Sequence, residues 1–242
     1  MKTLLAVTTY NQLSYTKKFL SAFKDVKIPG LDLIFLDDVS TDGTQNFLKE
    51  NNCTLLRRPK PRGLTYSWNL AYCKFKKENY DILILANNDV LVGQHALEEL
   101  IKNTLNRMLV CPLTSKHGAG HNWRNQAVMC HYPKLNHLVT KPGRFKKVQA
   151  LMVPGIKRMN KFNGFFFAMS RKIIQAEWDG GNLFDPSNVN VHQEGDLQSR
   201  MKEQPWVCTG SFIYHFKGVS FPKKGRVKGK DIRQNLNIYH GK

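Results

Sequence analysis

The chain lacks the cysteine patterns of metal-binding and redox proteins. Its five cysteines, in 242 residues, are scattered and odd in number, and none belongs to a C-x-x-C pair. Local zinc and redox motifs are therefore excluded. Cysteine usage of this kind is typical of a reducing compartment, so we expect a cytoplasmic protein, located in the host cytoplasm if the chain is viral.

Long apolar runs are also missing. No stretch approaches the roughly 18 residues that a membrane-spanning helix needs. The apolar run that follows Met1 is too short for the core of a signal peptide and predicts a buried first strand instead. We therefore expect no transmembrane segment, whereas the oligomeric state is left open by the sequence.

Acidic residues are scarce. Asp and Glu number 18 against 37 Lys and Arg, which gives a net charge of +19. Residues 1–140 carry 18 basic and 11 acidic side chains, whereas residues 141–242 carry 19 and 7. This excess predicts a polyanionic partner, such as a nucleic acid, an anionic membrane surface or an acidic glycan. The alternative is a solvated basic surface without a specific partner.

The first half of the chain alternates buried strands with helices. The apolar pattern predicts strands over 3–8, 31–36, 53–56, 81–86 and 109–113. Helical spacing lies between them, over 14–24, 42–51, 65–77 and 94–106. This alternation predicts an α/β fold with a mostly parallel, Rossmann-like sheet and right-handed crossovers.

The second half is less regular. Periodicity fades between residues 115 and 161, which predicts a binding loop or lid. The pattern after it predicts an aromatic strand, two helices and a late strand, over 163–170, 171–177, 193–202 and 207–215. The tail from Lys217 to Lys242 holds 8 basic residues and one acidic residue, and we expect it to form a surface arm.

Two polar turns follow strands of the predicted sheet. Asp37 and Asp38 end the second strand, and Asn87-Asn88-Asp89 ends the fourth. Open α/β sheets bind ligands at the carboxyl ends of their strands, so these turns predict a site for a cation and a polar ligand. Asp42 is expected to act as a helix cap instead.

These features resemble family 2 glycosyltransferases of the GT-A fold, whose members carry a D-x-D or N-N-D turn after that strand. The resemblance covers most of the chain, in the family's order. It implies an inverting, metal-dependent transfer of a sugar from a nucleoside diphosphate, with a UDP-sugar as the expected donor. It also implies a nucleotide-sugar-binding half (1–113), an acceptor and catalytic half of the same domain (114–216) and a basic arm (217–242).

The resemblance assigns the nucleotide site. It implies nucleoside contacts by the turn after the first strand, by one of the two adjacent acids, and by residues of the third helix and the N-N-D turn: Thr8, Thr9, Tyr10, Asn11, Asp37, Asp38, Gly63, Asn69, Asn87 and Asn88. The alternatives are structural: a strand-to-helix turn with an Asn cap, and a helix start with one exposed Asn. Val39 stands where the family has Gly.

The metal and the general base are assigned in the same way. Asp89 and His215 are implied as metal ligands, and this mixed set favours Mn²⁺ over Mg²⁺. Asn87 replaces the first acid of D-x-D by a neutral ligand. Glu194 aligns with the family's catalytic aspartate and is expected to act as general base, with Asp196 as the alternative. An acidic helix N-terminus is the structural alternative for both.

The donor sugar and the acceptor complete the predicted site. Gly164 matches a family position close to the donor sugar, whereas the aromatic residues 165–167 are expected in the core. Trp123 is a candidate for stacking on an acceptor base. Basic clusters predict contact with a phosphate backbone: Arg144, Lys146, Lys147, Lys157, Arg158, Lys223, Lys224 and Arg226.

The acceptor hypothesis follows from this charge. A hydroxymethylated pyrimidine in DNA is the favoured acceptor, a chemistry associated with bacteriophages. The first alternative is a transferase that acts on cell-envelope polysaccharide or glycolipid, with the basic surface on anionic lipid. The second is an inactive nucleic-acid-binding module on a transferase scaffold.

Overall fold

The computed structural model describes residues 1–57, 59–135, 141–177, 181–189 and 193–217. Lys223, Lys224 and Arg226, and with them the predicted basic arm beyond Lys217, lie outside the described residues.

An eight-stranded sheet runs through both halves of the chain, in the order β3-β2-β1-β4-β8-β6-β9-β7. Its strands are β1 (Thr3–Thr9), β2 (Leu31–Asp37), β3 (Thr54–Arg57), β4 (Ile82–Asn87), β6 (Leu109–Leu113), β7 (Ile156–Arg158), β8 (Phe166–Ser170) and β9 (Trp206–Phe212). Strands β8 and β7 run antiparallel to their neighbours, and the others are parallel. The predicted α/β fold with a mostly parallel sheet is confirmed.

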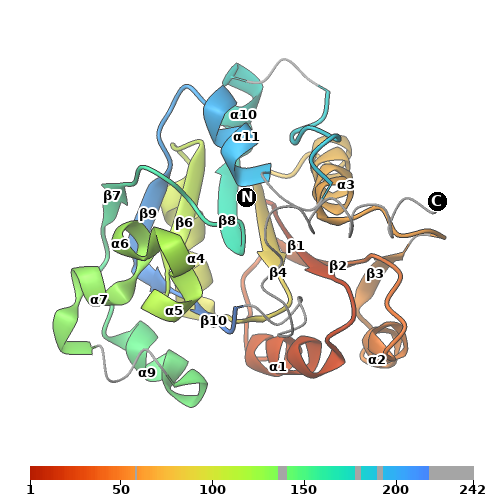
Figure 1. Ribbon diagram of the computed structural model, residues 1–242, viewed down its shortest axis with the longest axis horizontal. Coiled ribbons are helices and arrows are strands. Elements are labelled where there is room, and N and C mark those ends of the chain that lie inside the picture. Colours follow the sequence, from red (N-terminus) through yellow and green to blue (C-terminus); the bar gives the residue numbers. More distant parts are fainter. Residues whose placement is uncertain (58, 136–140, 178–180, 190–192, 218–242) are drawn as a thin grey trace, which may run out of the picture.

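Helices cover both faces of the sheet (Figure 1). One face packs against α1 (Leu13–Phe23), α2 (Thr44–Glu50) and α4 (Gln94–Thr104). The other packs against α3 (Leu64–Lys77), α10 (Arg171–Glu177) and α11 (Gln193–Arg200). Buried Phe19 and Leu97 anchor the first layer, and buried Trp68 and Phe75 the second. Burial of each such side chain contributes about 1.5–3 kcal/mol.

The segment between β6 and β8 is more regular than its sequence predicts. It holds α5 (Lys116–Ala119), η1 (Gly120–Asn122), α6 (Trp123–Gln126), α7 (Val128–His131), η2 (Pro133–Leu135), η3 (Pro142–Arg144), α9 (Phe145–Ala150) and β7. The described part of 115–161 is therefore not uniformly irregular, while its role as a binding loop or lid stays a prediction. Helices of three to six residues make fewer than two turns, which is too short for an amphipathic period to emerge.

The predicted late strand over 207–215 is broken in two. It forms β9 and then β10 (Tyr214–His215), which pairs with β5 (Val90–Leu91) in a separate ribbon. The β6–β9 register shifts between Pro112 and Leu113. Pro112 has no N–H to donate to the ladder, and the pairing resumes one residue later, where Leu113 pairs with Phe212 at the end of β9. The break returns the chain to β5 and thereby brings His215 beside the N-N-D turn.

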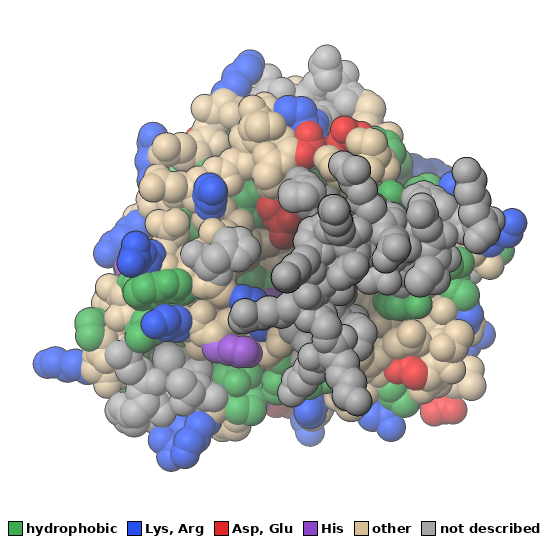
Figure 2. Space-filling view, viewed as in Figure 1, with side chains coloured by type: hydrophobic (Ala, Val, Ile, Leu, Met, Phe, Trp, Pro, Cys, Tyr) green, Lys and Arg blue, Asp and Glu red, His purple; other side chains and the backbone are tan. Residues whose placement is uncertain are grey.

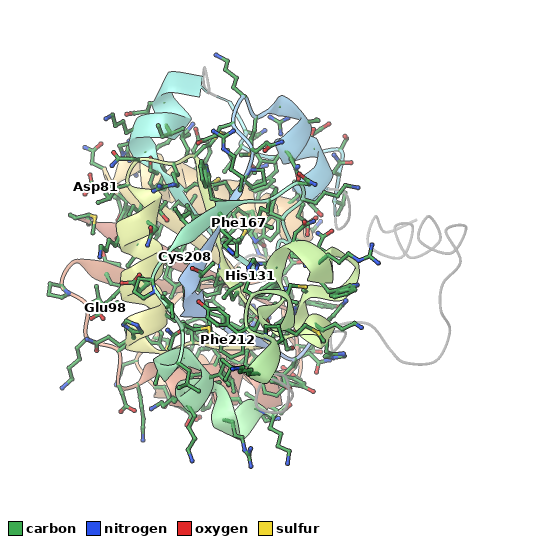
Figure 3. The ribbon with its side chains drawn as sticks, turned by 90° about the vertical axis from the view of Figure 1, so that its left-hand side faces the viewer. Asp81, Glu98, His131, Phe167, Cys208 and Phe212 are labelled. Atoms are coloured by element: carbon green, nitrogen blue, oxygen red, sulfur yellow. The ribbon has the colours of Figure 1, made fainter. Side chains whose placement is uncertain are left out.

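The core and the surface separate in the side view (Figure 3). Phe167 of β8 and Phe212 of β9 are fully buried and lie in the interior, whereas Asp81 and Glu98 lie at the margin. Among the described residues, no helix is long and apolar enough to cross a membrane.

Candidate active site

The turns that follow β1 and β2 are bonded to each other. The Asn11 N–H donates to Ser40 Oγ at 2.7 Å, and Asn11 Oδ1 accepts from the Thr41 N–H at 2.8 Å. The Leu13 N–H donates to Asp42 Oδ2 at 2.7 Å, and Asp42 also accepts from Thr44 at the start of α2. The N-cap residue of α2 is Gly43 and not the predicted Asp42, although the Asp42 carboxylate accepts backbone N–H bonds at the starts of both α1 and α2.

Asp37 is a buried carboxylate with several partners. It accepts from Thr9 Oγ1 at 3.2 Å and from the Ser40 N–H at 3.1 Å, and it lies 3.7 Å from Arg57 Nε. Its side chain therefore joins β1, β2 and β3. These contacts within the protein offset the cost of burying its negative charge.

Asp38 holds the loop before α3. Its Oδ1 accepts from the Arg62 N–H at 2.8 Å, and its Oδ2 accepts from the Gly63 N–H at 2.9 Å. Gly63 has φ 81°, a conformation that favours glycine. Both adjacent acids are thus engaged within the protein, and these contacts do not distinguish which one would hold a base.

Two predicted nucleotide-site amides make structural contacts. Asn88 Nδ2 donates to Thr16 Oγ1 at 2.9 Å. Asn69 is only 7% exposed and pairs with the Phe184 main chain, donating to its O at 2.8 Å and accepting from its N–H at 2.9 Å. The alternative of an exposed Asn on α3 is therefore wrong, and both amides are accounted for by internal contacts.

The end of β1 also holds predicted nucleotide-site residues. Thr8 Oγ1 donates to the Ala86 carbonyl, and Tyr10, in the turn after β1, is 42% exposed.

Asp89 and His215 are brought together, although 126 positions separate them in sequence. Asp89 Oδ2 lies 3.4 Å from His215 Nε2, and both side chains are buried. His215 Nδ1 donates to the Gly118 carbonyl at 2.9 Å, so Nε2 is the ring nitrogen that faces the carboxylate. The Phe216 N–H donates to the Asp89 carbonyl at 2.9 Å and fixes the two segments side by side.

The Asp89–His215 pair fits a divalent ion. Asp89 Oδ1 is buried without a hydrogen-bond partner among the described residues. An unsatisfied group of this kind costs about 1–3 kcal/mol or more, and a cation would satisfy it. One carboxylate and one imidazole suit Mn²⁺. No cluster of three His, Cys, Asp or Glu side chains that could hold a metal occurs in the described part of the chain.

Two residues that the sequence reasoning missed position His215. The Phe165 ring stacks on the imidazole, with centroids 4.4 Å apart and planes 10° apart. A Cβ on Gly118 would lie 2.6 Å from Thr114 Oγ1 and 3.1 Å from His215 Cβ. The expectation that Phe165 belongs to the core is confirmed, because it is 3% exposed. In the sequence, the two glycines at 118 and 120 were the one signal that another segment packs closely against this backbone.

Glu194 lies in the first turn of α11 and is held by Gly164. Its Oε1 accepts from the Gly164 N–H at 3.0 Å. A Cβ on Gly164 would come within 2.8 Å of both Glu194 Cδ and Trp68 Cη2. The absence of a side chain at this position is therefore what allows the carboxylate to approach. The two residues that the sequence predicted separately form one contact.

Asp196 makes different contacts. It accepts from Arg200 Nε at 3.2 Å and from the Asp185 N–H at 3.3 Å. This i, i+4 ion pair stabilises α11 and the loop before it. Of the two candidate bases, Glu194 is the one beside Gly164.

The dipeptide Gly164-Phe165 connects the two parts of the site. Gly164 bonds Glu194, Phe165 stacks on His215, and the Phe165 carbonyl accepts from the Asn87 N–H at 2.9 Å. A general-base candidate and a metal-ligand pair thus share one short segment at the carboxyl end of β4, where α/β sheets bind ligands.

The segment over 115–127 forms a wall of this site. Asn122 Nδ2 donates to the Phe162 carbonyl at 2.9 Å, while Gly118 holds His215 on the other side. The partly exposed Trp123 ring has Lys116 Nζ 4.4 Å and Arg124 Cζ 5.4 Å from its centroid. Its expected stacking role therefore competes with two cations already placed over the ring.

The predicted nucleic-acid contacts are dispersed. Lys146 pairs with Asp25 at 3.1 Å, Lys157 Nζ lies 3.4 Å from His131 Nδ1, and Arg158 lies over the Trp206 ring. Burial and the Lys157 charge lower the pKa of His131. Exposed Lys and Arg gather along the left and lower margins over β7, α7 and α9 (Figure 2). Arg144 and Lys147 are also exposed.

One compositional signal was missed. From residue 100 to residue 176 the sequence contains no Asp or Glu and 14 Lys and Arg. This acid-free segment supplies β6, the wall over 115–127, α9, β7 and β8. Together these elements therefore carry cations and no carboxylates of their own.

Comparison with known protein families gives one match. Residues 5–174 match the family described as Glycosyl transferase family 2. No curated protein sequence matches the chain significantly.

Solved structures share the fold at low sequence identity. A mannosyltransferase from Pyrobaculum calidifontis, in complex with GDP-Man and Mn²⁺, is 15% identical with a TM-score of 0.61, over 99% of this chain and 62% of that chain. S. aureus TarS 1–349 with UDP-GlcNAc is 13% identical with a TM-score of 0.60, over 99% and 65%. GalNAc-T7 with UDP, GalNAc and Mn²⁺ is 12% identical with a TM-score of 0.62, over 89% and 44%. The chain thus spans less than two thirds of each, and the likeness establishes a GT-A fold.

Proposed function

The chain belongs to glycosyl transferase family 2, and we propose that it transfers a sugar from a nucleoside diphosphate to a hydroxyl acceptor. The observation that carries the proposal is the Gly164-Phe165 dipeptide, which holds Glu194 on one side and His215 on the other. Such a transfer needs a general base for the acceptor hydroxyl and ligands for a metal ion that neutralises the diphosphate.

Glu194 is proposed as the general base. Its carboxylate accepts the proton of the acceptor hydroxyl while the hydroxyl oxygen forms a bond to the anomeric carbon. The bond from that carbon to the diphosphate oxygen breaks, and its electron pair leaves with the nucleoside diphosphate. Attack opposite the leaving group inverts the anomeric centre. The Gly164 N–H orients the carboxylate and leaves Oε2 for the acceptor.

Asp89 and His215 are proposed to hold the divalent ion, Mn²⁺ before Mg²⁺. When bound, such an ion neutralises charge on the diphosphate. Asp89 supplies the anionic oxygen, and the Gly118 carbonyl keeps His215 in the tautomer that can ligate. The neighbours contain UDP or GDP-Man with Mn²⁺, which supports a nucleotide-sugar donor; UDP remains our proposed carrier.

For the acceptor we propose DNA with a hydroxymethylated pyrimidine. The acid-free segment over 100–176, with its 14 cations, supports a polyanionic acceptor. A reactive base would have to leave the stack to reach Glu194. The partly exposed Trp123 lies on the wall of the site, where it would stack on that base.

A cell-envelope acceptor is the second candidate, and one observation favours it. Leu151 and Val153 are 50% and 60% exposed, close in sequence to the exposed cations Lys146 and Lys147. Exposed aliphatic side chains beside cations suit an anionic lipid surface better than a phosphate backbone.

A two-step assay tests these proposals. The first step measures Mn²⁺-dependent release of nucleoside diphosphate from UDP-, GDP- and dTDP-sugars, and no release from any donor would overturn the transferase. This outcome would favour an inactive binding module. The second step supplies hydroxymethylcytosine-containing duplex DNA or lipid-linked envelope glycans. Sugar transfer to the glycan and not to the DNA would replace the favoured acceptor by the second.

A further inference from the structure

Lys217 is a partly buried cation with no ion-pair partner in the part of the chain that the structure describes. It follows β10 by two residues and has φ 53°, so the chain turns sharply there. None of the ion pairs among the described residues includes it. A cation withdrawn from water without a counter-ion is unfavourable, so an anion that pairs with this ammonium would stabilise it.

The Lys217 side chain lies on the same wall as His215. Its ammonium rests against Gly120, so closely that a Cβ at that position would collide with Nζ. Gly118, two residues earlier, accepts from His215 Nδ1. The imidazole and the ammonium are therefore placed by one five-residue segment, over 116–120.

The composition of the N-N-D turn suggests a role for the Lys217 ammonium. Asn87 is neutral where the D-x-D pattern has an acid, so Asp89 is the one anionic side chain of that turn. A single carboxylate binds a divalent ion more weakly than two, since each carboxylate contributes a full charge to the ligand set. A fixed ammonium against the 116–120 segment would supply positive charge that does not depend on metal occupancy.

We propose that Lys217 binds the diphosphate of the donor directly and makes diphosphate binding partly independent of the metal. The inference rests on the proposed function and deepens it. Charge-assisted hydrogen bonds to phosphate are the strong kind, so the ammonium alone should favour a nucleoside diphosphate over the nucleoside. A bound metal ion would then increase the preference for the diphosphate over the nucleoside, but the preference would exist without the metal.

The test is a calorimetric titration of the full chain with UDP and uridine, and with GDP and guanosine, in Mn²⁺ and in EDTA. In EDTA the unaltered protein should bind the diphosphate about tenfold or more tightly than its nucleoside. The Lys217→Met variant should lose this preference in EDTA and keep part of it in Mn²⁺. Lys217→Arg should retain it. Lys102→Met, which removes an exposed charge on α4, is the matched control and should behave as the unaltered protein.

The outcomes separate the inference from the function on which it rests. No preference for either diphosphate even in Mn²⁺ would overturn both. A preference in Mn²⁺ that vanishes in EDTA for the unaltered protein would overturn the inference alone. An equal loss of nucleoside and diphosphate affinity in Lys217→Met would also overturn it, because that pattern indicates a structural role.

Discussion

Two regions at the carboxyl end of the sheet carry polar side chains, and they use them differently. In the turns after β1 and β2, the side chains of Asn11, Asp37 and Asp38 are bonded to neighbouring segments of the chain. Around β4 and β10, Asp89 Oδ1 has no hydrogen-bond partner among the described residues, and Lys217 appears in none of their ion pairs.

This difference in hydrogen bonding distinguishes side chains that stabilise the fold from side chains that are available to bind a ligand. A buried polar group that is satisfied within the fold stabilises the fold and has little reason to change partners. A buried group left unsatisfied costs free energy unless a ligand completes it. The first region is therefore satisfied as scaffold, whereas the second holds the groups that we propose to act on the donor and acceptor.

Replacing the proposed base would test the second region most severely. We expect Glu194→Gln to lower the transfer rate by roughly 10²–10⁴-fold, because an amide cannot take the hydroxyl proton. The amide oxygen can still accept from the Gly164 N–H, so thermal stability should change little. Initial rates at saturating donor and acceptor give the measurement.

Asp196→Asn is the matched control on the same helix turn. It weakens an ion pair with Arg200 and should leave the rate within about threefold, since exposed i, i+4 pairs contribute only about 0.3–0.5 kcal/mol. If Asp196→Asn lowers the transfer rate and Glu194→Gln does not, then Asp196 is the general base and Glu194 has the structural role.

Loss of a metal ligand comes next in size. We expect Asp89→Asn and His215→Asn each to lower Mn²⁺ affinity about 10–100-fold, as measured by Mn²⁺ electron paramagnetic resonance in the presence of UDP. The Asp89 variant should lose more, because it removes the anionic ligand and its charge. Unchanged Mn²⁺ affinity in both variants would place the ion elsewhere.

The adjacent acids test whether the first region is scaffold. Asp37→Asn and Asp38→Asn turn an amide towards backbone or hydroxyl donors, so each should lower the free energy of unfolding by about 1–3 kcal/mol. Affinity for UDP, by titration, should change less than about tenfold. A large loss of UDP affinity in one variant without a loss of stability would identify that residue as the base-binding acid.

The sequence predicted the parts of this arrangement that follow from strand ends, and it failed where distant segments meet. Buried runs such as 81–86 located β4 and its turn, because a parallel strand is apolar throughout. The contacts of His215 with Gly118 and Phe165 depend on the break after β9, which no local pattern predicts. The burial of Asn69 could not be predicted, because its partner Phe184 lies 115 positions away. Local signals identify strand ends, whereas burial and pairing decide what each side chain does there.

The smallest expected effect concerns strain in the first region. Val39 has φ 67°, and a β-branched residue in the left-handed conformation costs about 1–2 kcal/mol. Val39→Gly removes that strain but adds about 0.5–1 kcal/mol of backbone entropy to the unfolded chain. We expect a gain of about 0.5–1 kcal/mol and a Tm higher by about 1–4 °C. Asn11→Gly is the matched comparison at φ 56°: it deletes the bond to Thr41 and should lower the Tm. If Val39→Gly also lowers it, then packing of the valine outweighs its strain, and this turn is stabilised by the side chain that replaced the family's glycine.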